Sequence, residues 1–452
     1  MRRLSPGGWL AGLFGAAVLG AAVLGAAAGV EGAEALRAGA AAVEIALPAG
    51  TPLAGYGGFP RRAWLPDVLG RHPEAFWFRP SVGTHDPITA RALALEGDGV
   101  RVVWLALDLV GVDPSLVRDV RERLTRAGGP APTLVVSASH THSGPGGYAD
   151  SALFAFVALD RASPRVRRAV VAAMEQAGRL ALARLRPARL GVATTLVPDL
   201  AVSRLGKPLD PELGLLKVMG RDGRPVGALW NYAIHGTALA KQNRLLSGDL
   251  MGAAGAQIER RLGAPALFVN GAVADVSPRP RGWDGVRAGG EALAAAVLRA
   301  WAEAPLDDDA GLAVAAEPVT LPAPRLVLRN CAGRWLPRAL TMGLGAALPS
   351  QVELLGVRTG RAAWVTVPGE LETRLGLEIK AERSPAVPHV FVAGVSNDYL
   401  GYFLGPAGYD RPSYIACASL YGPTGGEAMR DGARRLVERL RPRGAAAPRR
   451  GV

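Results

Sequence analysis

The chain has 452 residues, of which 49% are hydrophobic and 20% are charged, so it holds ample apolar material for a globular core. Its formal net charge is +13, but the basic residues are scattered and form no stripe interleaved with aromatics, which argues against nucleic-acid binding. The 58 glycines and 35 prolines favour many turns and loops over a long helical bundle.

Residues 1–33 resemble a secretory signal peptide. A positive start at residues 1–3 precedes a small, apolar run over residues 9–30, and small residues follow where cleavage would occur. An uncleaved anchor is the alternative, because the run is nearly long enough to span a bilayer. We expect an exported protein, periplasmic or secreted, with membrane association as an option. Export would allow Cys331 and Cys417 to pair, which the sequence does not decide.

The elements predicted after this segment mix strands with helices. Strands are expected at 40–45, 88–95, 102–110, 134–136, 190–197, 266–269 and 390–395, with hairpins at 214–219/226–232 and 352–357/363–367. Helices are expected at 113–128, 163–185, 247–262, 285–304 and 424–440. This order predicts an α/β fold, with mixed β-sheets flanked by helices.

Three local features of this pattern carry expectations of their own. The glycine-rich loop at 51–58 lacks the lysine of a phosphate loop and is expected to let backbone approach a pocket closely. The Trp- and Phe-rich stretch at 61–81 is expected to be an irregular surface loop, open to contact with lipid. Asp108 lies in an apolar run, so it needs a partner or a place at a strand end.

Two histidines follow the buried strand at 134–136, in the segment Ser139-His140-Thr141-His142-Ser143-Gly144-Pro145-Gly146-Gly147. Side chains two residues apart on an extended chain point the same way, so His140 and His142 are expected to face one cavity. Neutral imidazole is the commonest metal ligand. The alternative is a pair of hydrogen-bonded loop histidines.

Other predicted strands also end in polar residues that suit catalysis or metal binding: His235, Asp275 with Ser277, Glu370 and Tyr399. In α/β sheets, sites gather at strand ends. A catalytic zinc usually takes three ligands from His, Asp and Glu, so two histidines and a carboxylate are a reasonable set. On the residues alone, Glu370 as a solvated turn residue and His235 as a core histidine stay open. The sequence has no Gly-x-Ser-x-Gly elbow, His-Glu-x-x-His helix or Rossmann glycine fingerprint.

These residues resemble the neutral/alkaline (non-lysosomal) ceramidase family. Residues 139–147 match its signature THTHSGPGG almost letter for letter. Further blocks follow in the family's order, at 203–204, 231–237, 247–249, 275–278, 368–370, 397–402 and 419–423. The resemblance covers residues 40–440, the family's N-terminal catalytic domain. It implies a catalytic domain at 34–440 followed by a basic tail at 441–452, without the C-terminal β-sandwich domain that usually follows in the family.

The resemblance also implies an activity and a set of site residues. The activity is zinc-dependent hydrolysis of the N-acyl amide bond of ceramide, giving sphingosine and a fatty acid. One Zn²⁺ is implied, held by His140, His235, Glu370 and Tyr399. His142, Arg204 and Tyr414 are implied to contact the scissile carbonyl or the tetrahedral intermediate, and Ser277 matches the active-site serine.

Zinc lowers the pKa of bound water and polarises a carbonyl, so attack by zinc-bound water, with Ser277 as a hydrogen-bonding partner, is expected over direct attack by Ser277. Beyond Tyr399 and around Tyr414 the sequence departs from the family's pattern, so the substrate entrance is expected to differ. The expected partners are a lipid amide and, peripherally, a membrane surface, with no nucleic acid. Two alternatives remain: a zinc hydrolase of another amide or ester, and a zinc-containing lipid- or surface-binding protein without turnover.

Overall fold

The computed structural model describes residues 36–126, 131–308 and 310–442. The expected signal peptide, and nearly all of the expected basic tail, lie outside these residues. Within the described ranges, no helix is both long and apolar enough to cross a membrane.

A nine-stranded mixed sheet forms the centre of the described fold, in the order β11-β9-β8-β6-β1-β3-β4-β5, with β13 beside β6. The outer pairs β11/β9 and β4/β5 are parallel, and the pairs between them are antiparallel. Its strands are β1 (Arg37–Glu44), β3 (Thr89–Gly97), β4 (Val100–Leu107), β5 (Thr133–Ala138), β6 (Arg186–Leu196), β8 (Glu212–Gly220), β9 (Pro225–Tyr232), β11 (Ala266–Asn270) and β13 (Leu306–Asp307).

A second, four-stranded sheet runs in the order β14-β17-β18-β20. Its strands are β14 (Leu312–Thr320), β17 (Gln351–Thr359), β18 (Ala362–Thr366) and β20 (His389–Ala393). It packs on one face of the central sheet, where Trp104 of β4 contacts Trp364 of β18 with ring centroids 5.7 Å apart. Both faces of β4 are apolar and buried, which is why the strand reads as a continuous hydrophobic run.

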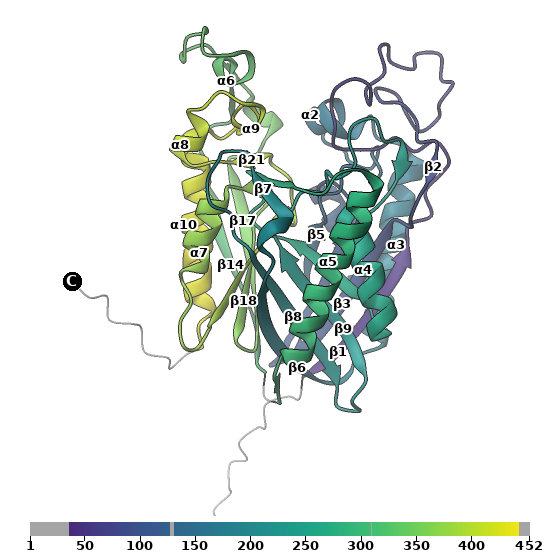
Figure 1. Ribbon diagram of the computed structural model, residues 1–452, viewed down its shortest axis with the longest axis vertical. Coiled ribbons are helices and arrows are strands. Elements are labelled where there is room, and N and C mark those ends of the chain that lie inside the picture. Colours follow the sequence, from purple (N-terminus) through teal and green to yellow (C-terminus); the bar gives the residue numbers. More distant parts are fainter. Residues whose placement is uncertain (1–35, 127–130, 309, 443–452) are drawn as a thin grey trace, which may run out of the picture. The chain divides into compact units, whose positions relative to one another are not determined.

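Helices cover the two outer faces. The other face of the central sheet packs against α1 (Pro114–Arg126), α3 (Pro164–Ala183), α4 (Asp249–Leu262) and α5 (Gly282–Glu303), and the second sheet packs against α7 (Thr373–Lys380) and α10 (Gly422–Leu440). Figure 1 shows α7 and α10 on one side and α3, α4 and α5 on the other. In α3, Ser163 caps the first turn by accepting from Val166 N, and Pro164 occupies the first position.

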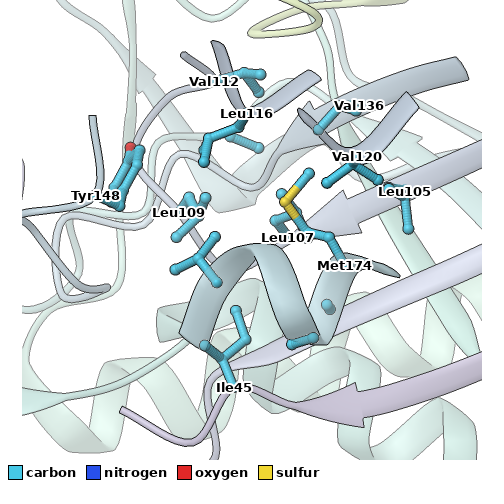
Figure 2. Close-up of a cluster of buried hydrophobic side chains, with 14 of the residues drawn as sticks. Ile45, Leu105, Leu107, Leu109, Val112, Leu116, Val120, Val136, Tyr148 and Met174 are labelled. Atoms are coloured by element: carbon cyan, nitrogen blue, oxygen red, sulfur yellow. The ribbon is translucent and has the colours of Figure 1, made fainter. Parts of the chain in front are cut away.

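Figure 2 shows the core between α1, α3 and the central sheet, with Met174 of α3 beside Leu105, Leu107 and Val136 of the strands. The α/β class and the mixed sheets flanked by helices are confirmed. The sequence pattern missed β14 and α7.

The two edges of the central sheet curl toward each other. Strand β11 contacts β5 although the two stand at opposite ends of the strand order. Strand β20 of the second sheet lies between these edges: Ser396, just after it, bridges Ser137 of β5, and Gly394 N donates to Asn270 O of β11 at 2.8 Å. The carboxyl ends of β5, β9, β11 and β20 therefore meet in one place, from which the site is built.

Short segments complete the fold around this place. They are β2 (Gly83–Thr84), β7 (Ala201–Ser203), β10 (Leu245–Leu246), β12 (Val276–Pro278), β15 (Arg325–Val327), β16 (Thr341–Gly343), β19 (Glu370–Leu371), β21 (Tyr402–Phe403), α2 (Ala152–Phe154), α6 (Leu328–Ala332), α8 (Pro406–Tyr409) and α9 (Tyr414–Cys417). A disulfide joins Cys331 in α6 to Cys417 in α9.

Candidate metal centre and active site

Three histidines and a carboxylate converge where the strands end. His140 Nε2 lies 3.2 Å from His235 Nε2 and 3.4 Å from His142 Nε2. The Glu370 carboxylate lies 3.2 Å from His140 Nε2 through Oε1 and 3.0 Å from His235 Nε2 through Oε2. His140, His235 and Glu370 are each at most 1% exposed. Four metal-ligating side chains from three segments of the chain therefore point at one buried spot.

The expectation that His140 and His142 face one place is confirmed, but the backbone achieves this differently. Strand β5 ends at Ala138, and His140 has φ = 63°, in the left-handed region that non-glycine residues seldom adopt. The chain is therefore not extended through the motif. A strained backbone of this kind needs support, and His140 N donates to Leu109 O while Gly236 N donates to His140 O.

Hydrogen bonding prepares His140 to act as a ligand. Its Nδ1 donates to Val110 O at 2.5 Å, which leaves the lone pair of Nε2 directed toward Glu370 and His235. A histidine that ligates a metal typically donates its other ring nitrogen in this way.

The charge state of the cluster suits a cation. Burial lowers the pKa of His235 to about 3, so this imidazole is in the neutral form that binds metals. Burial alone would raise the pKa of Glu370, but His140 and His235 beside it outweigh burial and hold that pKa well below its usual range. The ionised carboxylate and the neutral ring nitrogens are the donor types that zinc takes in proteins, so the residues fit the metal.

The four side chains expected to hold zinc lie together. The Tyr399 hydroxyl donates to Glu370 Oε1 at 2.7 Å, and the Tyr399 ring lies 6.0 Å from that of His140. His142 was expected to contact substrate instead. The ligand atoms of His140, His142 and His235 nevertheless lie within 4.8 Å of one another, a spacing that suits a shared metal ion. Geometry alone thus makes His142 a candidate ligand as well.

The other expected catalytic residues form a second, adjoining group. Strands β7 and β12 pair antiparallel, with Ser203 opposite Val276, and this pairing brings Arg204 to Ser277. Arg204 Nε donates to Ser277 Oγ at 2.8 Å, and its guanidinium lies 5.5 Å from the centre of the Tyr414 ring. The positive charge of Arg204 also acts on Glu370 and His235, which links the two groups.

Tyr402 belongs to this second group and was missed at the sequence level. It hydrogen-bonds with both Arg204 and Tyr414, and its ring lies 6.2 Å from that of Tyr414. Burial raises its pKa well above the usual value, so the phenol stays protonated and able to donate. No strand pattern flags it, because β21 is only two residues long.

Arg61 and Asn270 also support the site without having been predicted. Arg61 is 1% exposed, and its Nη1 donates to the main-chain oxygens of His142 at 2.8 Å and Ala54 at 3.0 Å. Asn270 Nδ2 donates to Ser139 O at 3.1 Å and to Ile234 O at 2.9 Å. These two carbonyls immediately precede His140 and His235, so one side chain ties together both histidine-bearing segments.

Two further expectations are confirmed nearby. A Cβ added at Gly55 would come within 2.5 Å of the His142 ring, so the glycine-rich loop does approach the site closely, with Gly55 at φ = 98°. Asp108 sits just beyond the end of β4, where it accepts from Thr89 N at 3.0 Å and pairs with the buried Arg91 at 3.3 Å.

Comparisons with known proteins find similarity to one family. Residues 79–284 match the family described as neutral/alkaline non-lysosomal ceramidase, N-terminal. A neutral ceramidase of Oryza sativa subsp. japonica is 31% identical over 193 residues, covering 38% of this chain and 24% of that protein. A neutral ceramidase of Pseudomonas aeruginosa is 27% identical over 221 residues, covering 44% and 33%. The matched stretch thus spans about a quarter to a third of these curated relatives.

The fold is similar over a longer stretch. The crystal structure of the neutral ceramidase from Pseudomonas aeruginosa superposes with a TM-score of 0.75 at 20% identity, covering 92% of this chain and 76% of that one. A structure titled as ceramidase complexed with C2 gives the same TM-score of 0.75. Residues 79–284 are thus similar in sequence to the N-terminal domain of the neutral/alkaline non-lysosomal ceramidase family, and the fold is similar to that of a solved neutral ceramidase over most of the chain.

Proposed function

We propose that the chain is a zinc-dependent hydrolase that cleaves the N-acyl amide bond of ceramide or a ceramide-like lipid. Water adds its oxygen and one proton to the acyl carbon to give the fatty acid, and its other proton goes to the amine nitrogen. The C–N bond breaks and frees the sphingoid base. The observation that carries the proposal is the convergence of His140, His235 and Glu370 on one buried spot. The names of the relatives supply the substrate class.

His140, His235, Glu370 and Tyr399 would hold the zinc ion. Bound there, zinc would lower the pKa of a water molecule to about 7 and polarise the amide carbonyl. The deep burial of His140, His235 and Glu370 supports the assignment, because a surrounding of low dielectric constant strengthens the field of a bound ion. His142, whose ring faces the same spot, would contact the scissile carbonyl.

Arg204, Tyr402 and Tyr414 would stabilise the oxyanion that forms when the amide carbonyl is attacked. All three present N–H or O–H donors, and Arg204 keeps its charge because burial is outweighed by the neighbouring tyrosines and Glu370, which raise its pKa. The Tyr414 ring is 62% exposed, so this group borders solvent and is open to substrate.

Ser277 would orient the substrate or the attacking water. A serine nucleophile needs a neighbouring base to take its proton. The Ser277 hydroxyl instead accepts a hydrogen bond from the Arg204 guanidinium, which cannot act as a base.

We also propose that residues 34–440 form the catalytic domain and that the chain is exported. The Cys331–Cys417 disulfide supports export, because such bonds persist in oxidising compartments.

The test is fatty-acid release from a long-chain N-acylsphingosine by the purified protein, with and without a chelator and with zinc added back. Release that stops with the chelator and returns with zinc is the expected result. A protein that binds zinc stoichiometrically but releases no fatty acid would refute the substrate assignment. His140→Ala is expected to lose zinc and activity together, whereas Ser277→Ala is expected to keep zinc.

A further inference from the structure

Two groups of exposed apolar side chains flank the site. The first lip consists of residues 59–69 together with Phe156 and Val157, and the second lip of residues 335–342. In the first lip Trp64 is 80% and Leu65 79% exposed, and in the second Trp335 is 77% exposed. The remaining large apolar side chains exposed on the lips are Phe59, Val68, Leu69, Phe156, Val157, Leu340 and Met342. A cluster of exposed apolar side chains of this kind marks an interaction surface.

Segments adjoining the two lips contact residues of the site. At the first lip, the Tyr56 ring lies 4.8 Å from that of His142, and the Phe154 ring of α2 lies 5.1 Å from that of Tyr399. At the second, the Cys331–Cys417 disulfide joins α6 to α9, which begins with Tyr414. Figure 1 shows α6 and α9, and α2 with the loop that carries the first lip, at the same end of the described fold.

The first lip is held in place by polar contacts together with contacts among aromatic rings, such as those of Phe59 with Trp64 and of Phe156 with Trp77. The Asp160 carboxylate accepts from the main-chain N–H groups of Phe76, Trp77 and Phe78 at 2.8–3.1 Å. Arg62 packs over the rings of Phe78 and Phe156 at 4.9 and 4.7 Å and donates to Gly57 O. The loop is thus fixed with Trp64 and Leu65 pointing outward, although folding inward would bury them.

The charge around the lips selects one kind of partner. Residues 328–345 contain Arg329, Arg334 and Arg338 and no acidic residue, and Arg338 pairs with Asp410 at 3.4 Å. Residues 59–82 carry Arg62, Arg71 and Arg79 against Asp67, once the buried Arg61 and the buried Glu74 are left out. Exposed aromatic and aliphatic side chains bordered by arginines match the surface of a bilayer that contains anionic lipid.

We propose that the two lips dock the protein on an anionic membrane surface, with the site facing the bilayer. This deepens the proposed function, since a lipid amide would then pass from the bilayer to the site without crossing water. Both lips lie outside residues 79–284 apart from Phe156 and Val157, so this surface is largely a feature of the chain beyond the stretch matched to the family.

The test is co-sedimentation of the full chain with vesicles of phosphatidylcholine, with and without phosphatidylglycerol. Binding to the phosphatidylglycerol vesicles is expected, weakened by salt. Trp64→Ser with Leu65→Ser, and separately Trp335→Ser, should each weaken it about tenfold or more. Arg334→Gln should reduce the preference for phosphatidylglycerol. Leu377→Ser is the matched control, because Leu377 is 39% exposed on α7, outside both lips, and should leave binding unchanged.

Three outcomes would overturn the proposal. The unmodified chain binds neither kind of vesicle, the lip variants bind vesicles as well as the unmodified chain does, or the chain is a dimer in solution that the lip substitutions dissociate into monomers. The last would assign the lips to a second copy of the chain. Failure of the proposed reaction is separable, because vesicle binding is measured without turnover. Conversely, the lip variants should release fatty acid from a detergent-dispersed short-chain N-acylsphingosine as the unmodified chain does.

Discussion

Asn270 offers the sharpest test of how the metal centre is held. Its side-chain amide donates to Ser139 O and Ile234 O, and its Oδ1 accepts from Ile234 N at 3.2 Å and Gly271 N at 2.9 Å. Asn270→Asp keeps the shape and the acceptor but replaces the N–H₂ donor with an oxygen. The carbonyls that precede His140 and His235 then lose their shared donor.

The expected cost follows from those two contacts. A buried carbonyl left without a partner costs about 1–3 kcal/mol, so two of them lower the free energy of unfolding by roughly 2–6 kcal/mol. Loosening the support behind metal-binding histidines typically weakens metal affinity about 10–100-fold. We therefore expect Asn270→Asp to lose both stability and zinc affinity.

The assay measures the two losses separately. Urea unfolding of the metal-free protein gives stability, and competition with a chromophoric chelator gives zinc affinity. Asn231→Asp is the matched control: Asn231 is a buried amide near the end of β9 that donates to Val269 O, Asn270 O and Val392 O, and none of these bonds goes to Ser139 O or Ile234 O. It should lose stability with much less loss of zinc affinity. If both variants bind zinc alike, the bridging role assigned to Asn270 is wrong.

Three more substitutions test the surroundings of the site. Arg61→Met leaves the main-chain oxygens of His142 and Ala54 without their donor, so it should lower the melting temperature, although removal of a buried charge, whose pKa burial lowers to about 10, offsets part of that loss. It should also lower kcat about 10–100-fold because His142 loses its main-chain support, and an unchanged kcat would contradict that role. Burial raises the folded-state pKa of Asp249 to about 6, above its unfolded value of 3.8, so its contribution to stability is complete below pH 3.8 and is lost as pH rises through 6. The measurement compares the free energy of unfolding of the unmodified chain with that of Asp249→Asn at each pH. The difference between the two should fall by about 3 kcal/mol from below pH 3.8 to above pH 6, and a difference that does not change with pH would argue against a buried, protonated carboxyl. Replacing Cys331 and Cys417 with serine removes a covalent link between residues 86 apart in the sequence and should lower the free energy of unfolding in urea by about 4–5 kcal/mol. Equal stability of the oxidised and reduced chains would disprove this contribution.

Local sequence predicted most of the longer strands and helices, and its pattern singled out His140, His235 and Glu370 as candidate ligands. The roles of Tyr399, Arg204 and Tyr414 were implied by the family resemblance and stay predictions. The runs before His140 and Tyr399 have the apolar, β-branched composition of buried strands, the run before His235 is apolar, and polar residues follow each run within a few positions. The spacing of apolar residues in α3 and α10 likewise fixes which helix face is buried.

Only the tertiary structure decided which of these residues meet. His140 follows β5 and His235 follows β9, near opposite edges of the central sheet, and no local pattern shows that the edges curl together around β20. Arg61, Asn270 and Tyr402 act through contacts with residues far away in the chain, for example over 131 positions from Asn270 to Ser139. Strand pairing across such separations depends on how two sheets pack, which is a property of the whole core and not of any segment within it.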